Sequence, residues 1–322
     1  MRPLFADPKT DFAFKKIFGT EEHKPLLIAL LNGLLELDDA HRVVEVHLLT
    51  PEQRPAVQGL KNSIVDVKCV DARGTHYVVE MQVLNVEGFE KRVIYNVAKA
   101  YTSQLDAGRP YPELDDVVGV TICDFELWPR VEGAHVPMLS RWRMQEQHMG
   151  ARGLGHLQFV FLELPKYDAH RPPVTAVEKW AYFFREAPSL QMVPEVLAER
   201  PFRDALEAAR AAGFTEEEWE TYLRAGMAIQ DERGALSLAE KQGHQRGRLE
   251  GMEEGQEAGR RALRTSIRKV LQKRGLSLEP QQEALLESCM DLGTLERWLD
   301  QALTAASAPE ALRDNSTDGS GA

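Results

Sequence analysis

Two β-branched segments lie close together in the N-terminal third of the chain, and they constrain its fold more than any other feature. Residues 63–70 read SIVDVKCV and residues 76–83 read HYVVEMQV, and both have the composition of buried β-strands. The link Asp71-Ala72-Arg73-Gly74 is short, polar and ends in glycine, so we expect a β-hairpin. Each strand carries an acidic residue near its middle, Asp66 in the first and Glu80 in the second.

The segments around the hairpin complete the pattern of an α/β fold. Residues 24–37 are densely apolar and predict a buried helix, while residues 43–49 predict a strand. Apolar residues recur at spacings of three and four through 89–105, which predicts an amphipathic helix, and residues 116–125 predict a buried strand. The resulting order is αβββαβ. A further strand is expected at 157–164, and the glycines and prolines of 127–155 predict loops between these two strands.

The remainder of the chain predicts helices. We expect a helical accessory region over 175–238, a C-terminal helical pair over 265–304 and a disordered tail over 305–322. Between them, residues 239–264 form a charged helix or linker with glycine at every fourth position from 243 to 259. Each helical glycine costs about 0.8 to 1 kcal/mol relative to alanine. Either a second helix packs closely on the glycines, as in a homodimer, or the segment is a flexible linker.

Composition excludes several classes of protein. With 322 residues, 43% apolar and 28% charged, the chain resembles an ordinary globular protein. Its three cysteines are far apart, which predicts neither disulfides nor a zinc site. Charged residues within the first twenty positions argue against a secretory signal, and no apolar stretch is long enough to cross a bilayer, so we expect a cytoplasmic protein. The net charge of −11 opposes loose binding to nucleic acid, although cations bound at an acidic site reverse the local field.

The two acidic residues of the hairpin suggest phosphodiester chemistry. Hydrolysis of a phosphodiester needs hard cations with oxygen ligands, which polarise the phosphoryl group and activate water. Asp66 and Glu80 can lie side by side on neighbouring strands, and Gln82 lies on the same face two residues further on. A buried carboxylate without compensation is costly, so two of them favour a metal site. The alternative is a solvated sheet face on which Lys68 neutralises a carboxylate, and spacing alone leaves both open.

A resemblance to a known family covers more than a third of the chain. It is carried by residues 7–19 (DPKTDFAFKKIFG), 64–68 (IVDVK) and 79–83 (VEMQV), and by Phe89 with Lys91-Arg92. These segments resemble the Rpn family of recombination-promoting nucleases, which are transposase-like proteins of the PD-(D/E)xK nuclease superfamily. The resemblance implies a restriction-endonuclease-like core over residues 1–165 and a metal-dependent DNA endonuclease acting in DNA recombination, with DNA as its partner.

The resemblance also assigns roles at the acidic site. It implies that Asp66, Glu80 and the backbone carbonyl of Met81 bind Mg²⁺, for which Mn²⁺ can substitute. Gln82 stands where the superfamily usually has lysine, and an amide can form hydrogen bonds but brings no positive charge. This departure, together with the acidic net charge, leaves open a catalytically weak or inactive protein that binds DNA or acts as an oligomeric regulator.

Further residues are candidates for contacting DNA or supporting the site. Asp11, Lys15 and Lys16 lie in the first matched segment, although Thr10 or Asp11 can also be a helix cap. In the helix after the hairpin, the spacing of polar residues predicts an exposed face opposite the apolar stripe, which can hold the DNA backbone or be merely solvated. That face consists of Arg92, Asn96 and Lys99.

Overall fold

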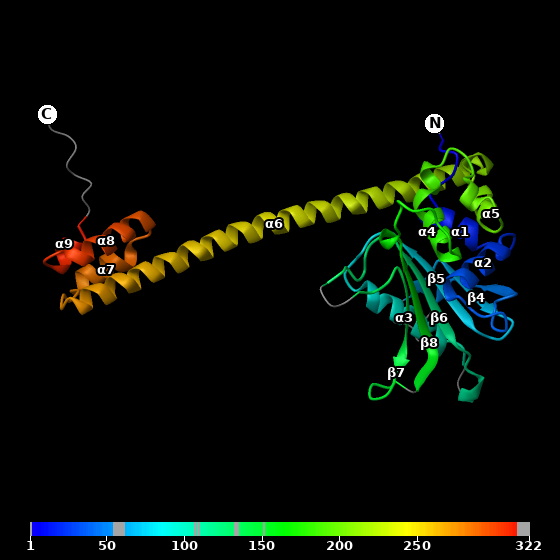
Figure 1. Ribbon diagram of the computed structural model, residues 1–322, viewed down its shortest axis with the longest axis horizontal. Helices are drawn as coiled ribbons and strands as arrows, with labels where there is room; N and C mark the ends of the chain where they lie inside the picture. The colour runs from blue at the N-terminus through cyan, green and yellow to red at the C-terminus, as the bar shows by residue number, and fades with distance from the viewer. Residues whose placement is uncertain are drawn as a thin grey trace. The chain divides into compact units, whose positions relative to one another are not determined.

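The chain forms two compact units. The computed structural model describes residues 2–53, 62–105, 108, 110–131, 135–150 and 152–313. The first unit spans Met1–Arg233 and the second spans Gly234–Ala322 (Figure 1). The first unit is built on a six-stranded sheet with the order β1-β4-β5-β6-β8-β7, which confirms the predicted α/β fold.

The sheet is mixed, with an antiparallel part on each side of a parallel centre. β5, β6 and β8 run parallel, whereas β1 with β4, β4 with β5, and β7 with β8 pair antiparallel. The strands are β1 Val46–Leu49, β4 Val67–Asp71, β5 His76–Gln82, β6 Val117–Cys123, β7 Leu139–Gln145 and β8 Gly153–Glu163. A separate two-stranded sheet joins β2 Glu52–Gln53 to β3 Ser63–Ile64. The predicted hairpin is therefore present as β4 and β5.

The first hairpin strand is not continuous, contrary to the prediction of a single strand over 63–70. β3 ends at Ile64 and β4 begins at Val67, so Asp66 lies in a bend rather than in the middle of a strand. Val65 N–H donates to the carbonyl of Pro51 at 3.1 Å, which draws this part of the chain toward β2. The Asp66 carboxylate instead reaches β5, where it accepts the backbone N–H of Met81 at 2.7 Å.

β7 corrects the prediction that residues 127–155 form loops only. It forms one edge of the sheet, and β8 begins at Gly153, inside the same predicted loop region. Within β7 only Ser140 is buried, and most of the strand is exposed. An edge strand of this kind has no apolar face to mark it in the sequence. Arg141 attaches it to the preceding helical layer through the carbonyl of Leu34 at 3.0 Å.

Helices cover both faces of the sheet and separate its two sets of side chains. On one face, Val79 and Met81 of β5 join a large core with aromatic residues such as Phe14 and Trp180. The helices of this layer are α1 Asp11–Phe18, α2 Lys24–Leu35, α4 Ala176–Glu186 and α5 Phe202–Ala208. On the other face, Val78 packs with Val97 of α3 Phe89–Thr102. Because β5 side chains alternate, Glu80 faces α3 as Val78 does.

Short 3₁₀ helices complete the connections of the first unit. They are η1 Tyr111–Glu113, η2 Leu164–Lys166, η3 Ala187–Ser189, η4 Glu195–Leu197 and η5 Ala211–Gly213. In the described residues, no helix is both long and apolar enough to span a lipid bilayer.

Helix α6, Glu216–Lys273, is longer than predicted. It runs from the expected accessory region at 175–238 through the glycine repeat, which is helical, into the expected C-terminal pair at 265–304. The second unit continues with α7 Pro280–Ser288, α8 Leu292–Thr304 and α9 Ala308–Ala311. α9 lies inside the segment expected to be a disordered tail, whereas residues 314–322 lie outside the described residues.

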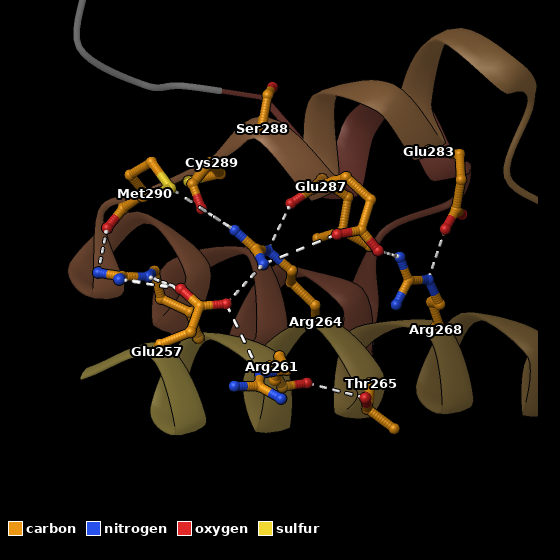
Figure 2. Close-up of polar contacts among 12 residues, drawn as sticks. Glu257, Arg261, Arg264, Thr265, Arg268, Glu283, Glu287, Ser288, Cys289 and Met290 are labelled. Atoms are coloured by element: carbon orange, nitrogen blue, oxygen red, sulfur yellow. Dashed lines mark hydrogen bonds and ion pairs between the residues drawn. The ribbon is translucent and has the colours of Figure 1, made fainter. Parts of the chain in front are cut away.

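A buried arginine forms hydrogen bonds between helices of the second unit. Arg264 of α6 is 6% exposed and donates to the carbonyls of Leu286 and Cys289 at 3.1 and 2.8 Å (Figure 2). Its guanidinium also lies 3.8 Å from Glu257 and 3.7 Å from Glu287. The carbonyls near the end of α7 therefore have a charged donor, which is how helix ends are commonly satisfied.

Candidate functional site

Asp66 lies at the bend between β3 and β4 with its carboxylate largely buried. One oxygen, Oδ2, accepts the Met81 N–H, and the other, Oδ1, lies 3.9 Å from Nζ of Lys15. Burial, with smaller contributions from the negative charges of Glu80 and Asp11, raises the pKa of Asp66 to about 7. The Met81 N–H and Lys15 act in the opposite direction but do not offset the burial.

Glu80 is the second buried acid, on the neighbouring strand. Its side chain is held by Asn96 of α3, whose Nδ2 donates to Oε1 at 2.6 Å. Burial raises the pKa of Glu80, while the Asn96 hydrogen bond and the charge of Arg92 lower it. Because the charge of Glu80 acts on the pKa of Asp66, the two carboxylates share one electrostatic environment. The structure thus brings together the two acids singled out in the sequence.

Asn96 corrects the prediction of an exposed polar face on α3. It is 2% exposed and turned toward Glu80 rather than toward solvent. Its Oδ1 is buried and has no hydrogen-bond partner among the described residues. The sequence gives a weak signal for this contact, because Asn96 lies beside the apolar Val97 and Val93 on a helix of ordinary amphipathic period.

Gln82 is the third residue of the predicted constellation, and its carboxamide is engaged at both ends. Nη2 of Arg92 donates to Oε1 of Gln82 at 2.5 Å, and Nε2 of Gln82 donates to the carbonyl of Leu84 at 2.8 Å. Arg92 also lies over the ring of Phe89, with its Cζ 5.3 Å from the ring centroid. The guanidinium is therefore held in place from two sides.

These side chains open into one cleft with a volume of 790 Å³. Its lining contains both acids together with cationic side chains and exposed apolar groups. The lining includes Ile64, Asp66, Glu80, Gln82, Lys91, Arg92, Tyr95 and Asn96. Such a cleft gives a phosphate-bearing ligand cationic groups beside a pair of carboxylates.

The other predicted residues divide between the site and the scaffold. Lys15 is ion-paired with Asp11 at 2.5 Å and also lies near Asp66, but neither Lys15 nor Asp11 lines the cleft. Lys16 instead binds Glu218 of α6 at 2.5 Å. Thr10, not Asp11, caps α1, since its hydroxyl accepts from Ala13 N–H. On α3, Lys99 is likewise absent from the cleft lining.

The donor set suits a hard cation with few protein ligands. Asp66 and Glu80 supply oxygen atoms, and across the described ranges no cluster of three or more His, Cys, Asp or Glu side chains is suited to a metal. Mg²⁺ commonly binds one or two carboxylates and keeps several waters. Asn96 lines the same cleft, and its buried Oδ1 is an acceptor without a partner among the described residues. The Met81 N–H is engaged by Asp66, and a ligand role for its carbonyl remains a prediction.

Comparison with known proteins gives one family match. A family model described as PD-(D/E)XK nuclease family transposase matches residues 8–239, which is more than half of the chain. No curated protein and no solved structure gives a match. The matched segment contains all the cleft residues and most of the first unit.

Proposed function

The chain belongs to the PD-(D/E)XK nuclease family of transposases, and on that basis we propose that it is a Mg²⁺-dependent DNA endonuclease. The observation that carries the proposal is the pair of carboxylates, the buried Glu80 and the partly buried Asp66, which line a single cleft. Burial raises the pKa of both groups, so their ionised forms need a compensating positive charge. A divalent cation supplies that charge.

The roles of the residues follow from their contacts. Asp66 and Glu80, with the Met81 carbonyl, would hold Mg²⁺, and Mn²⁺ would fit the same oxygen donors. When bound, the cation polarises the phosphoryl group and lowers the pKa of the attacking water. Asn96 fixes the orientation of the Glu80 carboxylate through its 2.6 Å hydrogen bond. The Met81 N–H fixes that of Asp66 in the same way.

DNA is the proposed substrate despite the net charge of −11. Lys91 and Arg92 place positive charge at the wall of the cleft, beside the acids. A substrate phosphate would therefore meet a local field that differs from the field of the whole chain. Binding would be specific to the cleft and weak elsewhere, and it should fall with increasing salt.

Nicking of supercoiled plasmid tests the proposal directly. The wild type should nick DNA in Mg²⁺ or Mn²⁺ but not in EDTA, and Asp66→Asn should lower the rate at least about 100-fold. Asp38→Asn is the matched control, because Asp38 is an exposed acid paired only locally with His41. Nicking that survives Asp66→Asn, or that continues in EDTA, contradicts the assigned site.

We also propose that a second copy of the chain packs along the glycine repeat of α6. The repeat residues are largely exposed, and a Cβ added at Gly243, Gly247, Gly251 or Gly255 would meet nothing within 4 Å. Nothing in the described part of the chain therefore requires glycine there, although alanine would stabilise the helix by about 0.8 to 1 kcal/mol per site. Close approach of another backbone does require it.

Sedimentation of the double variant Gly247→Ala with Gly251→Ala separates the two possibilities. A helix–helix contact predicts a shift from dimer to monomer mass. An unchanged mass in the variant, or a monomeric wild type, contradicts the contact. Far-UV circular dichroism should show helix content preserved or increased in either case.

A further inference from the structure

The positive charge that lysine usually brings to this superfamily's motif is missing at Gln82, and the structure indicates where it comes from. We propose that Arg92 is the phosphate-binding cation of the cleft and that Gln82 is the residue that positions it. The inference rests on the proposed nuclease function and deepens it. In this assignment Gln82 positions Arg92 and does not itself contact the substrate.

The contacts of Gln82 leave its carboxamide little to offer a substrate. Its oxygen accepts from Arg92 at 2.5 Å, and its nitrogen donates to the carbonyl of Leu84 at 2.8 Å. The Leu84 contact fixes which end of the amide points toward Arg92. Gln82 thus acts as an oriented acceptor for a guanidinium.

Arg92 has the donors and the support to bind a phosphate at the same time. A guanidinium carries five N–H donors in a rigid fork, and the hydrogen bond to Gln82 uses only Nη2. Phe89 supports the group at 5.3 Å. The residue lines the cleft, and its charge acts on Glu80, where it lowers the pKa of the carboxyl group. It therefore lies within electrostatic reach of Glu80.

The geometry of α3 and β5 explains why one arginine can reach this position. Glu80 and Gln82 are two residues apart on a strand, a rise of about 6.6 Å. Asn96 and Arg92 are four apart on a helix, a rise of about 6.0 Å. Glu80 therefore pairs with Asn96, and Gln82 pairs with Arg92. The two pairs have similar spacing on the strand and on the helix, which run in opposite directions.

The other nearby cations fit the role less well. Lys15 lies 3.9 Å from Asp66 but is bound to Asp11 and does not line the cleft. Its charge lowers the pKa of Asp66, but it is not placed to meet a ligand in the cleft. Lys91 lines the cleft, but among the described residues it has no hydrogen bond or ion pair with either acid or with Gln82.

The test is a set of four variants assayed for oligonucleotide cleavage in Mg²⁺. Arg92→Gln should lower kcat about 100-fold with a smaller change in KM. Gln82→Lys should also have a low kcat, because the charge of the new lysine repels Arg92. The double variant Gln82→Lys with Arg92→Gln should recover at least about tenfold over Arg92→Gln, because it returns a cation to the motif. The matched control is Arg143→Gln, which removes another exposed arginine that donates to a glutamine, Gln145.

The outcomes separate this inference from the proposed function. If the wild type cleaves and Arg92→Gln stays within threefold of it, or the double variant is no faster than Arg92→Gln, the assignment of Arg92 is wrong. If the wild type does not cleave, the nuclease proposal fails, and Arg92 is judged by oligonucleotide binding in Ca²⁺. There, Arg92→Gln should reduce the slope of log affinity against log salt by about one. An unchanged slope refutes the phosphate contact.

Discussion

Replacing Asp66 with asparagine should stabilise the metal-free protein at neutral pH. The pKa of Asp66 is raised from 3.8 to about 7 in the folded state, chiefly by burial. Between pH 4 and pH 7 the folded state therefore keeps a proton that the unfolded state releases. The free energy of unfolding contributed by this group is greatest below pH 4 and is lost as the pH rises to about 7.

The magnitude follows from the shift. A difference of roughly three pKa units corresponds to about 4 kcal/mol at 1.36 kcal/mol per unit. Asparagine keeps an oxygen for the Met81 N–H but carries no charge, so the pH dependence should disappear in Asp66→Asn. At pH 8 in EDTA the variant should exceed the wild type by up to about 4 kcal/mol, and at pH 4 the two should be similar.

Urea unfolding followed by tryptophan fluorescence measures this difference. Four of the five tryptophans, Trp128, Trp142, Trp180 and Trp219, lie in the first unit. Adding Ca²⁺ should reverse the order at pH 8, because a cation that binds the folded wild type stabilises it and the variant loses this effect. Parallel pH profiles for the two proteins, or a less stable variant at pH 8 in EDTA, refute the reasoning.

Three further predictions concern the surroundings of the site and the second unit. Asn96→Ala should destabilise the protein by about 1 to 3 kcal/mol. It should also shift the acidic limb of the pH–rate profile to higher pH, because the hydrogen bond from Asn96 lowers the pKa of Glu80. Gly119→Ala should lower both the unfolding midpoint and the cleavage rate, since its Cβ would lie 2.6 Å from Val97 of α3, and adding Val97→Ala should restore part of each. Arg264→Ala should destabilise the second unit by about 3 to 5 kcal/mol, because it leaves buried acceptors and nearby carboxylates uncompensated. The fluorescence of that unit's single tryptophan measures the loss, and plasmid nicking should be unchanged.

The sequence predicted the elements whose signals are local. The polar link from Asp71 to Gly74 indicated the hairpin, and the three-and-four spacing of Phe89, Val93 and Val97 indicated α3. The family match to residues 8–239 confirms the predicted superfamily. The residue boundaries expected for the accessory regions remain predictions, as do the roles assigned to the site residues.

The features that the sequence did not predict depend on distant contacts. The strand break at Asp66 requires Val65 to bond with Pro51, fourteen positions away in numbering. The burial of Asn96 requires a partner on β5, which helical periodicity does not reveal. β7 is stabilised by pairing with β8 and has almost no buried side chains of its own. In each case tertiary context decides the structure.

The bond between Asp66 and the Met81 amide has a practical consequence for genetics and biochemistry. The acid closes a gap in the bonding of the sheet as well as facing the cleft, so alanine at position 66 removes a ligand and strips a backbone amide of its acceptor in a single step. If Asp66→Ala is inactive, the loss could therefore come either from the missing ligand or from a loosened strand. Asparagine separates the two, and it is the better choice for a catalytically dead version of the protein in cells.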